Sequence, residues 1–332
     1  MPKAKKIKVA VIGAGNMGSN HVRNYTAIPD AELVAIADND RNVKKISKDF
    51  KVPFFEDYKK MIKEAKPDAV SIAAPTNLHK EIGLYCMENG IHCLVEKPIA
   101  ITIKEADELI GTAEKLGVIF TVGHIERYNP VIRKIKEIID NKELGKILSV
   151  VCTRVGGFPD LEPKTDVIID LAVHDIDIIN NLLGRLPGKI STHGSRTHHT
   201  KEIDSAKILL DYGNAGGFIQ ANWVTPVKIR TIALTGSHGY IEGNYITQEL
   251  THYKHNMRAV REGFTSFVSS LGEAAKEIIS VDFQEPLAIE LKKFIAAVKS
   301  GDDSELVKPW DAREALRLAL EAVKDYKIER AT

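Results

Sequence analysis

Residues 7–18 read IKVAVIGAGNMG, an apolar run followed at once by a glycine-rich turn. The run is rich in Val and Ile, which favours a strand buried on both faces. The turn has the spacing G-x-G-x-x-G at Gly13, Gly15 and Gly18, and a helical pattern begins near Asn16. In such a turn the first glycine permits a tight bend, the second lets the backbone approach a pyrophosphate, and the third lets the helix pack on the strand. The stretch therefore predicts a strand, turn and helix that bind a dinucleotide.

A carboxylate follows this turn at the distance that ribose binding requires. The second apolar run ends at Asp38, 20 residues after Gly18. Such a carboxylate accepts hydrogen bonds from the adenosine ribose and repels a 2′-phosphate, so we expect NAD, with NADP as the weaker alternative because Arg41 is near in the sequence. The other alternative is a turn that binds nothing, with Asp38 capping a helix. The cofactor residues predicted from this segment are Gly13, Gly15, Asn16, Met17 and Asp38.

Short apolar runs continue to alternate with helical segments up to residue 122. This alternation is typical of a parallel sheet covered by helices on both faces. One helix has a clear start, a capping box between Thr102 and Glu105, and a clear stop at Gly117. We expect residues 1–122 to form an α/β Rossmann domain with a doubly wound parallel sheet. The predicted strands are 7–12, 32–37, 69–74, 93–96 and 119–122.

The pattern changes after Gly123. From residue 189 to 253, alternating apolar runs are separated by Gly, Asn and Pro, which is typical of an antiparallel sheet. A chain of 332 residues also favours two domains over one. We therefore expect residues 123–332 to form an α+β domain with an open, mostly antiparallel sheet. The predicted elements include helices at about 130–140, 167–183, 286–299 and 310–328, and strands at 147–155, 206–211, 217–224 and 229–235.

Composition excludes several classes of protein. Lys plus Arg total 46 and Asp plus Glu total 45, so the net charge of +1 provides no field for binding nucleic acid or an anionic membrane. Cys86, Cys93 and Cys152 are odd in number and form no C-x-x-C pair, which favours reduced thiols. The apolar run after the basic start is too short for a signal peptide, and none approaches the roughly 20 residues that span a bilayer. We expect a cytoplasmic protein.

A lysine stands where the fourth predicted strand ends, in Glu96-Lys97-Pro98. The carboxyl edge of a parallel sheet is where ligands bind in such folds. The ammonium of Lys97 is suited to donate to a substrate hydroxyl and stabilise the alkoxide that forms as hydride leaves. The alternative is a surface lysine paired with Glu96. Pro98 is compatible with either a cis bond or a simple strand end.

The third predicted strand also ends in polar residues at that edge. The segment from Ala74 through Pro75 and Asn77 to His79 is placed to line the nicotinamide ribose. A helix N-cap at Asn77 explains the same residues. Both interpretations stay open on the sequence alone.

Three titratable residues recur at helical spacing in the second half. Asp170, His174 and Asp177 are spaced i, i+4, i+7, which places them on one face of a regular helix whose other side is apolar. Charged groups on such an element favour a wet cleft or a partner. Histidine suits the removal of a hydroxyl proton, since its ordinary pKa lies near neutrality, and a neighbouring carboxylate can orient it. The alternative is a buried structural histidine with Asp177 as its partner.

Other polar residues carry weaker signals. His193, His198 and His199 lie in a polar turn without a companion ligand pattern, so we expect a solvated loop and no metal site. Further cationic candidates for an anionic substrate are Arg154, Lys164 and Arg230.

Together these motifs resemble the glucose–fructose oxidoreductase, inositol dehydrogenase and MocA family of NAD(P)-dependent sugar oxidoreductases. The resemblance spans essentially the whole chain. It implies that Lys97, Asp170 and His174 form the catalytic set, with His174 as acid and base, and that Asp177 helps to hold the substrate. It implies that the open sheet forms a homodimer or homotetramer interface. By the same resemblance the further cofactor residues are Ala74, Pro75, Asn77, His79, Glu96 and Lys97.

One segment narrows the substrate. Residues 122–130, VGHIERYNP, resemble the corresponding stretch of UDP-N-acetylglucosamine 3-dehydrogenases, which implies oxidation of the C3 hydroxyl of a UDP-sugar. Arg127 there could offer a two-point contact to phosphate and Tyr128 a flat surface, or both could pack the junction between the domains. Two other functions stay open: a dehydrogenase of free sugars or inositol, and a non-catalytic NAD-sensing regulator on the same scaffold. A regulator needs the nucleotide site but not Lys97, Asp170 and His174.

Overall fold

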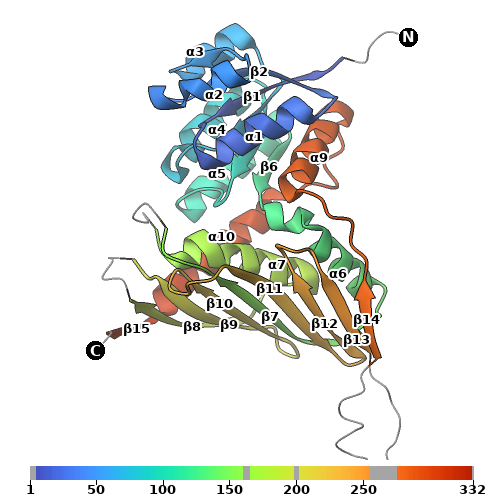
Figure 1. The fold of residues 1–332 in the computed structure, drawn as a ribbon. Helices are drawn as coiled ribbons and strands as arrows, with labels where there is room; N and C mark the ends of the chain where they lie inside the picture. Colours follow the sequence, from blue (N-terminus) through green and yellow to red (C-terminus); the bar gives the residue numbers. More distant parts are fainter. Residues whose placement is uncertain (1–4, 160–164, 198–201, 255–274, 331–332) are drawn as a thin grey trace, which may run out of the picture. The chain divides into compact units, whose positions relative to one another are not determined.

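The computed structural model describes residues 5–159, 165–197, 202–254 and 275–330. The chain forms two compact units with one sheet each (Figure 1). The first unit comprises Met1–Tyr128 and Gln284–Arg317, and the second comprises Asn129–Phe283 and Leu318–Thr332. The sequence patterns predict one crossing near residue 122, and they do not reveal the return of residues 284–317 to the first unit.

The first unit contains six parallel strands in the order β3-β2-β1-β4-β5-β6. This is the doubly wound order, in which ligands bind at the carboxyl edge where the strand order reverses, between β1 and β4. The strands are β1 (Ile7–Ile12), β2 (Ala31–Ala37), β3 (Phe54–Phe55), β4 (Ala69–Ile72), β5 (His92–Glu96) and β6 (Phe120–Gly123).

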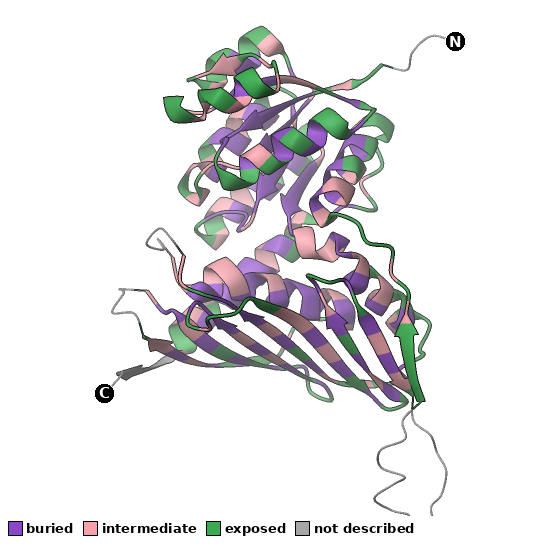
Figure 2. Ribbon diagram, in the orientation of Figure 1, coloured by how far each residue is buried: buried purple, intermediate pink, exposed green. Residues whose placement is uncertain are grey.

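Helices cover both faces of this sheet, since β1, β4 and β5 are buried along nearly their whole length (Figure 2). Apolar residues of α9, including Leu291 and Phe294, join those of α1 and β1 in one core. Figure 1 places α1 and α9 side by side. The helical elements are α1 (Asn16–Ala27), η1 (Arg41–Val43), α2 (Lys44–Asp49), α3 (Tyr58–Ala65), η2 (Thr76–Leu78), α4 (His79–Glu88), α5 (Ile103–Leu116), η3 (Ile125–Tyr128) and α9 (Pro286–Ser300).

The second unit contains a sheet of nine strands in the order β14-β13-β12-β11-β7-β10-β9-β8-β15. Adjacent strands are antiparallel except in the pairs β10–β7 and β15–β8. The strands are β7 (Ile147–Val155), β8 (Lys189–Arg196), β9 (Ser205–Asp211), β10 (Gly216–Asn222), β11 (Ile229–Gly236), β12 (Gly239–Asn244), β13 (Leu250–Lys254), β14 (Ala275–Ile279) and β15 (Lys327–Arg330).

Helices of the second unit lie on one face of its sheet (Figure 1). They are α6 (Pro130–Asp140) and α7 (Val173–Leu183), and a π-helical turn, η4 (Ile168–Ala172), leads directly into α7. Strand β9 alternates buried and exposed residues, as expected when one face is covered and the other is open. Helix α10 (Pro309–Asp325) runs across the division between the units at residue 317.

The predicted fold class is confirmed, with some differences at element ends. The strands at 7–12 and 147–155 and the helix at 130–140 have the predicted bounds. The capping box of Thr102 and Glu105 is present, and Gly117 ends α5 in the left-handed conformation. The last predicted helix, 310–328, ends at Asp325 and is followed by β15. Within the described residues, none of the helices is both long and apolar enough to span a bilayer.

Candidate functional site

The glycine turn has the geometry of a dinucleotide cradle. Gly13 has a φ of +88°, and a Cβ there would lie 2.6 Å from the backbone of Ala73. A Cβ on Gly18 would lie 1.8 Å from the carbonyl oxygen of Gly13. A Cβ on Gly15 would meet nothing within 4 Å. The first and third glycines are therefore required by packing, whereas the second leaves open space, as the predicted roles demand.

The start of α1 suits an anion. Gly15 is its N-cap and provides no side-chain cap, and no acidic residue lies in the first turn. Gly15, Asn16 and Met17 are exposed. Because the first amides of a helix have no partner within the helix and carry the positive end of its dipole, this terminus fits the pyrophosphate of a dinucleotide.

Asp38 joins the glycine turn to the end of β2. Its Oδ2 accepts a hydrogen bond from the amide of Ala14 at 2.6 Å, and its Oδ1 accepts one from the amide of Asp40 at 2.8 Å. The carboxylate is half-buried beside the turn. Arg41, which could weaken discrimination against a 2′-phosphate, forms an ion pair with Glu56, with Nε 2.9 Å from Oε1.

His79 links two loops at the carboxyl edge. Its Nδ1 lies 3.0 Å from the carbonyl oxygen of Pro98, and its Nε2 lies 2.9 Å from that of Ala74. The side chain is 1% exposed, and burial lowers its pKa against the opposing effect of the two carbonyls. His79 thus holds the segment after β4 against the segment after Lys97. Of its neighbours, Ala74 is half-buried, and Pro75 and Asn77 are exposed at the surface of this edge.

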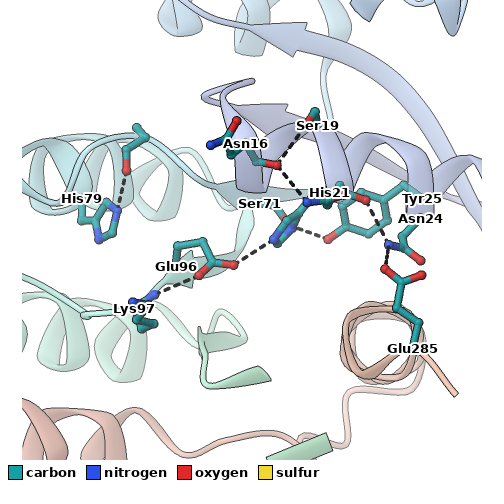
Figure 3. Close-up of polar contacts among 12 residues, drawn as sticks. Asn16, Ser19, His21, Asn24, Tyr25, Ser71, His79, Glu96, Lys97 and Glu285 are labelled. Carbon is teal, nitrogen blue, oxygen red and sulfur yellow. Dashed lines mark hydrogen bonds and ion pairs between the residues drawn. The ribbon is translucent and has the colours of Figure 1, made fainter. Parts of the chain in front are cut away.

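Glu96, at the end of β5, is a buried carboxylate. Nε2 of His21 lies 2.9 Å from its Oε1, and the amide of Lys97 donates to its Oε2 at 3.2 Å (Figure 3). Burial alone favours the neutral acid, but the hydrogen bond from His21 and the positive charges of His21 and Lys97 outweigh it and hold the pKa of Glu96 below its ordinary value. Glu96 therefore holds the backbone of Lys97 in place through this hydrogen bond.

Lys97 itself is half-buried, and the Lys97–Pro98 peptide is cis. All predicted cofactor residues thus belong to the first unit and lie at the ends of its parallel strands or in the segments that follow them. They are Gly13, Gly15, Asn16, Met17, Asp38, Ala74, Pro75, Asn77, His79, Glu96 and Lys97. Their contact with a cofactor stays a prediction.

Sequence reasoning missed the buried residues behind this edge. His21 is fully buried on α1, and Tyr25, one turn further, places its hydroxyl 2.6 Å from Oγ of Ser71. Glu290 on α9 is 1% exposed, and burial followed by the charge of Glu96 raises its pKa well above the ordinary value. For His21 the helical spacing was a signal, because residues 18, 21, 22 and 25 form the stripe that α1 buries.

In the second unit, Asp170 and His174 are half-buried, whereas Asp177 is 1% exposed. Asp170 lies in the π-turn η4, and His174 and Asp177 lie in α7. The prediction of one regular helix through all three residues is therefore wrong at Asp170, because a π-turn contains more residues per turn than an α-helix. The burial of Asp177 gives no support to its predicted substrate contact, which stays a prediction.

The predicted phosphate-binding residues pack within the first unit. Nη1 of Arg127 lies 2.8 Å from Oδ2 of Asp311, and the side chain is 12% exposed. Tyr128 is 4% exposed, and its hydroxyl accepts a hydrogen bond from the amide of Val307 at 3.2 Å. These contacts show that both side chains pack within the first unit, and a flat exposed surface at Tyr128 is not present; the substrate roles of both residues stay predictions.

The further cationic candidates differ in their surroundings. Arg154 forms a buried ion pair with Asp175. Arg230 donates from Nη1 to the carbonyl oxygens of Val155, at 2.5 Å, and Ile229, at 2.9 Å. Lys164 lies outside the described residues.

The described part of the chain contains no group of three or more His, Cys, Asp or Glu side chains arranged to hold a metal ion. His193 lies in β8, and His198 and His199 lie outside the described residues. Cys86, Cys93 and Cys152 are buried and form no disulfide.

Comparisons with known proteins agree with this geometry. Residues 7–124 match the family model described as "Oxidoreductase family, NAD-binding Rossmann fold", and residues 132–242 match the "GFO/IDH/MocA C-terminal domain". Two similar curated proteins are UDP-N-acetylglucosamine 3-dehydrogenase of Acidithiobacillus ferrooxidans, 26% identical over 88% of both chains, and scyllo-inositol 2-dehydrogenase (NAD(+)) of Bacillus subtilis, 26% identical over 97% of this chain and 94% of the relative.

A solved structure of the Acidithiobacillus ferrooxidans UDP-N-acetylglucosamine 3-dehydrogenase matches with a TM-score of 0.84 at 24% identity, over 97% of this chain and 98% of that one. At this identity the likeness shows the shared fold. The two family models, the doubly wound sheet with its glycine cradle and the open second sheet lead to one conclusion. The chain belongs to the GFO/IDH/MocA family of NAD-binding oxidoreductases.

Proposed function

We propose that this chain is an NAD-dependent dehydrogenase that oxidises the C3 hydroxyl of UDP-N-acetylglucosamine to a ketone. The observation that carries the reaction class is the pairing of a dinucleotide cradle with Lys97 at the end of β5, in a chain whose second unit presents a half-buried Asp170 and His174. The substrate is supported by the residues 122–130 and by the similarity to a UDP-N-acetylglucosamine 3-dehydrogenase.

In the proposed reaction a carbinol loses two hydrogens, one as a hydride from carbon and one as a proton from oxygen. A bound nicotinamide dinucleotide supplies the hydride acceptor. His174 takes the hydroxyl proton on a ring nitrogen while the carbinol C–H bond breaks and the C=O bond forms. Lys97 donates a hydrogen bond to the same oxygen and stabilises its developing negative charge. Asp170 orients the imidazole and stabilises its protonated form. In the reverse direction His174 returns the proton.

NAD is proposed over NADP. The carboxylate of Asp38 lies beside the glycine turn, where it would repel a 2′-phosphate. Arg41 is the cation nearest in the sequence, and its guanidinium is paired with Glu56. The discrimination therefore rests on Asp38, and Asp38→Ala is expected to narrow the preference for NAD when the two cofactors are titrated.

A dehydrogenase of free sugars or inositol is the second candidate. Two observations favour it: the guanidinium of Arg127 is paired with Asp311, and the scyllo-inositol 2-dehydrogenase relative covers nearly the whole chain. Arg127→Ala separates the two. Diphosphate binding predicts a KM for UDP-N-acetylglucosamine raised roughly tenfold or more. Asp311→Asn, which breaks the same ion pair but keeps the guanidinium, is the control and should leave that KM nearly unchanged. Equal KM values in wild type and Arg127→Ala would show that Arg127 does not bind the diphosphate of the substrate.

A cytoplasmic homo-oligomer is also proposed. The cytoplasmic location is supported by three buried cysteines that form no disulfide. Assembly is supported by the face of the second sheet opposite its described helices. There Leu209, Phe218, Val151 and Ala233 lie side by side across four strands, with Leu209 56% and Val151 37% exposed.

The test is absorbance of reduced nicotinamide in a single turnover, measured across UDP-sugars, free sugars and inositols. We expect a response to UDP-N-acetylglucosamine. Lys97→Ala and His174→Ala should each abolish it while NAD still binds. Normal turnover in either variant would overturn the assigned roles, and silence across the whole panel with intact NAD binding would support the sensing function instead.

A further inference from the structure

A buried ion pair lies directly beside His174. Asp175, the next residue of α7, accepts two hydrogen bonds from Arg154 of β7: Nε donates to Oδ2 at 2.8 Å, and Nη2 donates to Oδ1 at 2.9 Å. Both side chains are almost completely buried, with 4% of Arg154 and 1% of Asp175 exposed. The guanidinium also lies 5.2 Å from the centre of the Tyr245 ring. Arg154 is therefore held by a carboxylate and by an aromatic face.

Stability alone is a poor reason for such a pair. Removing two charges from water is costly, and apolar side chains of similar size commonly serve the fold as well or better. What a two-point contact between a planar guanidinium and a carboxylate provides is a fixed orientation. Since successive residues of an α-helix point about 100° apart, fixing Asp175 also fixes the direction in which His174 leaves α7.

The backbone just before α7 is not a regular α-helix, so it does not by itself fix the direction of His174 relative to Asp170. The π-turn of Ile168–Ala172 precedes α7 and carries Asp170, so regular α-helical hydrogen bonding does not continue from Asp170 to His174. Strand β7, which carries Arg154, is paired along its length with β10 on one side and β11 on the other. The ion pair thus ties the start of α7 to the middle of a sheet.

We propose that Arg154 and Asp175 are positioning residues for His174, which together set the rotation of α7, and that Arg154 balances the charge of Asp175, the residue that follows His174. The proposal rests on the proposed function of His174 as proton acceptor. It assigns no contact with the substrate to either residue.

The activity test removes the two-point geometry while keeping the charge. Arg154→Lys retains a cation but not the planar fork, and we expect kcat with UDP-N-acetylglucosamine or scyllo-inositol, whichever is turned over, to fall about tenfold or more while KM changes less than about threefold. Arg313→Lys is the matched control. Arg313 makes a similar two-point contact with Asp107 in the first unit, so its loss should lower stability without lowering kcat. A wild-type kcat in Arg154→Lys would overturn the proposal.

A double variant separates orientation from stability. Arg154→Met combined with Asp175→Leu removes both charges together, so thermal stability is expected to stay near that of the wild type. Its kcat should nevertheless remain about tenfold or more below wild type, since the two-point contact that sets the rotation of α7 is lost. Full activity in this variant would contradict the proposal. If the double variant does not fold, the lysine variant and the titration below decide.

A titration of the free protein needs no turnover. The ring resonance of His174 in histidine-labelled protein is identified by its absence in His174→Gln, and its chemical shift is followed against pH. Asp175→Asn leaves the charge of Arg154 unbalanced near the start of α7 and should lower the titration midpoint, whereas Arg154→Met leaves the charge of Asp175 unbalanced and should raise it, each by about one pH unit. Asp170 and Asp177, the other charged residues of η4 and α7 in this stretch, are the same in both variants.

The titration distinguishes a failure of the positioning proposal from a failure of the proposed function. Shifts in the same direction, or none, overturn the positioning proposal even if the enzyme is active. Opposite shifts in a protein that turns over no substrate support the ion pair's influence on His174 and count against the proposed function instead.

Discussion

Glu290 shows how strongly the surroundings of one residue can change its charge. Both carboxyl oxygens are buried and have no hydrogen-bond partner within the described part of the chain. Desolvation by the apolar core, and then the charge of Glu96, raise the pKa of Glu290 well above its ordinary value. We therefore expect a neutral carboxylic acid inside the first unit at neutral pH.

This state has a consequence for stability. Above the ordinary pKa of a carboxyl group in the unfolded chain, the folded chain holds one more proton at Glu290 than the unfolded chain does, so the free energy of unfolding falls as pH rises towards the raised pKa. Glu290→Gln removes this dependence. In thermal unfolding, the melting temperature of the variant minus that of the wild type should be larger at pH 8 than at pH 5.

Glu88→Gln, an exposed position on α4, is the control for this experiment and should follow the wild type at both pH values. A parallel pH dependence in wild type and Glu290→Gln would show that Glu290 is ionised in the folded protein. The burial of Glu290 could not be predicted from the sequence, because it depends on α9 packing against α1, which lies far away in the chain.

At the scale of elements, local signals predicted most of the regular structure. The strand 7–12 and the glycine turn were predictable because apolar runs, β-branched residues and glycine spacing act within a few residues. The π-turn at Ile168–Ala172 was not, since the sequence there keeps the apolar pattern of an ordinary helix. The two-residue strand β3 and the strand β15 exist through pairing with β2 and β8, which no local pattern reveals.

The glycine turn allows a matched comparison. Gly18→Ala places a Cβ 1.8 Å from a carbonyl oxygen, so we expect a loss of about 1–3 kcal/mol in the free energy of unfolding. Gly15→Ala meets open space, so stability should change by less than about 0.5 kcal/mol. Its methyl group would nevertheless occupy the proposed path of the pyrophosphate, and NAD affinity should fall roughly tenfold or more.

Chemical denaturation and NAD titration measure these two effects separately. Gly111→Ala on α5, where a Cβ also meets nothing within 4 Å, is the control and should bind NAD as the wild type does. Unchanged NAD affinity in Gly15→Ala would mean that the cofactor does not approach this turn.

In the whole molecule, the two architectures were predictable from the sequence, but the segments that make up each unit were not. Residues 284–317 return to the first unit through contacts such as the pair of Arg23 with Glu285, whose Nη2 and Oε1 lie 2.5 Å apart. A surface ion pair between residues so distant in sequence leaves no local trace. The proposed catalytic roles of Lys97, Asp170 and His174 likewise rest on family resemblance together with residue chemistry, and spacing alone leaves structural alternatives open.

The proposed assembly through the open sheet gives a prediction at this scale. Leu209→Asp places a charge in the exposed apolar row of β9, β10, β7 and β11, so the variant should sediment as a smaller species than the wild type at equal concentration. Lys207→Asp, on the same face of β9 but outside that row, is the control. A monomeric wild type, or an unchanged oligomer in Leu209→Asp, would contradict assembly through this face.

We propose that hydride passes from a ring carbinol of a UDP-sugar to a nicotinamide held by this chain. The most direct measurement uses UDP-N-acetylglucosamine deuterated at its ring carbons, one equivalent of enzyme and NAD, with the mass of the reduced cofactor as the readout. We predict a reduced cofactor one mass unit heavier than that formed from the unlabelled sugar, and no such product from His174→Ala. Reduced cofactor without the label, or no reduction of NAD by this sugar under conditions where deuterated scyllo-inositol yields the labelled cofactor, would contradict the claim.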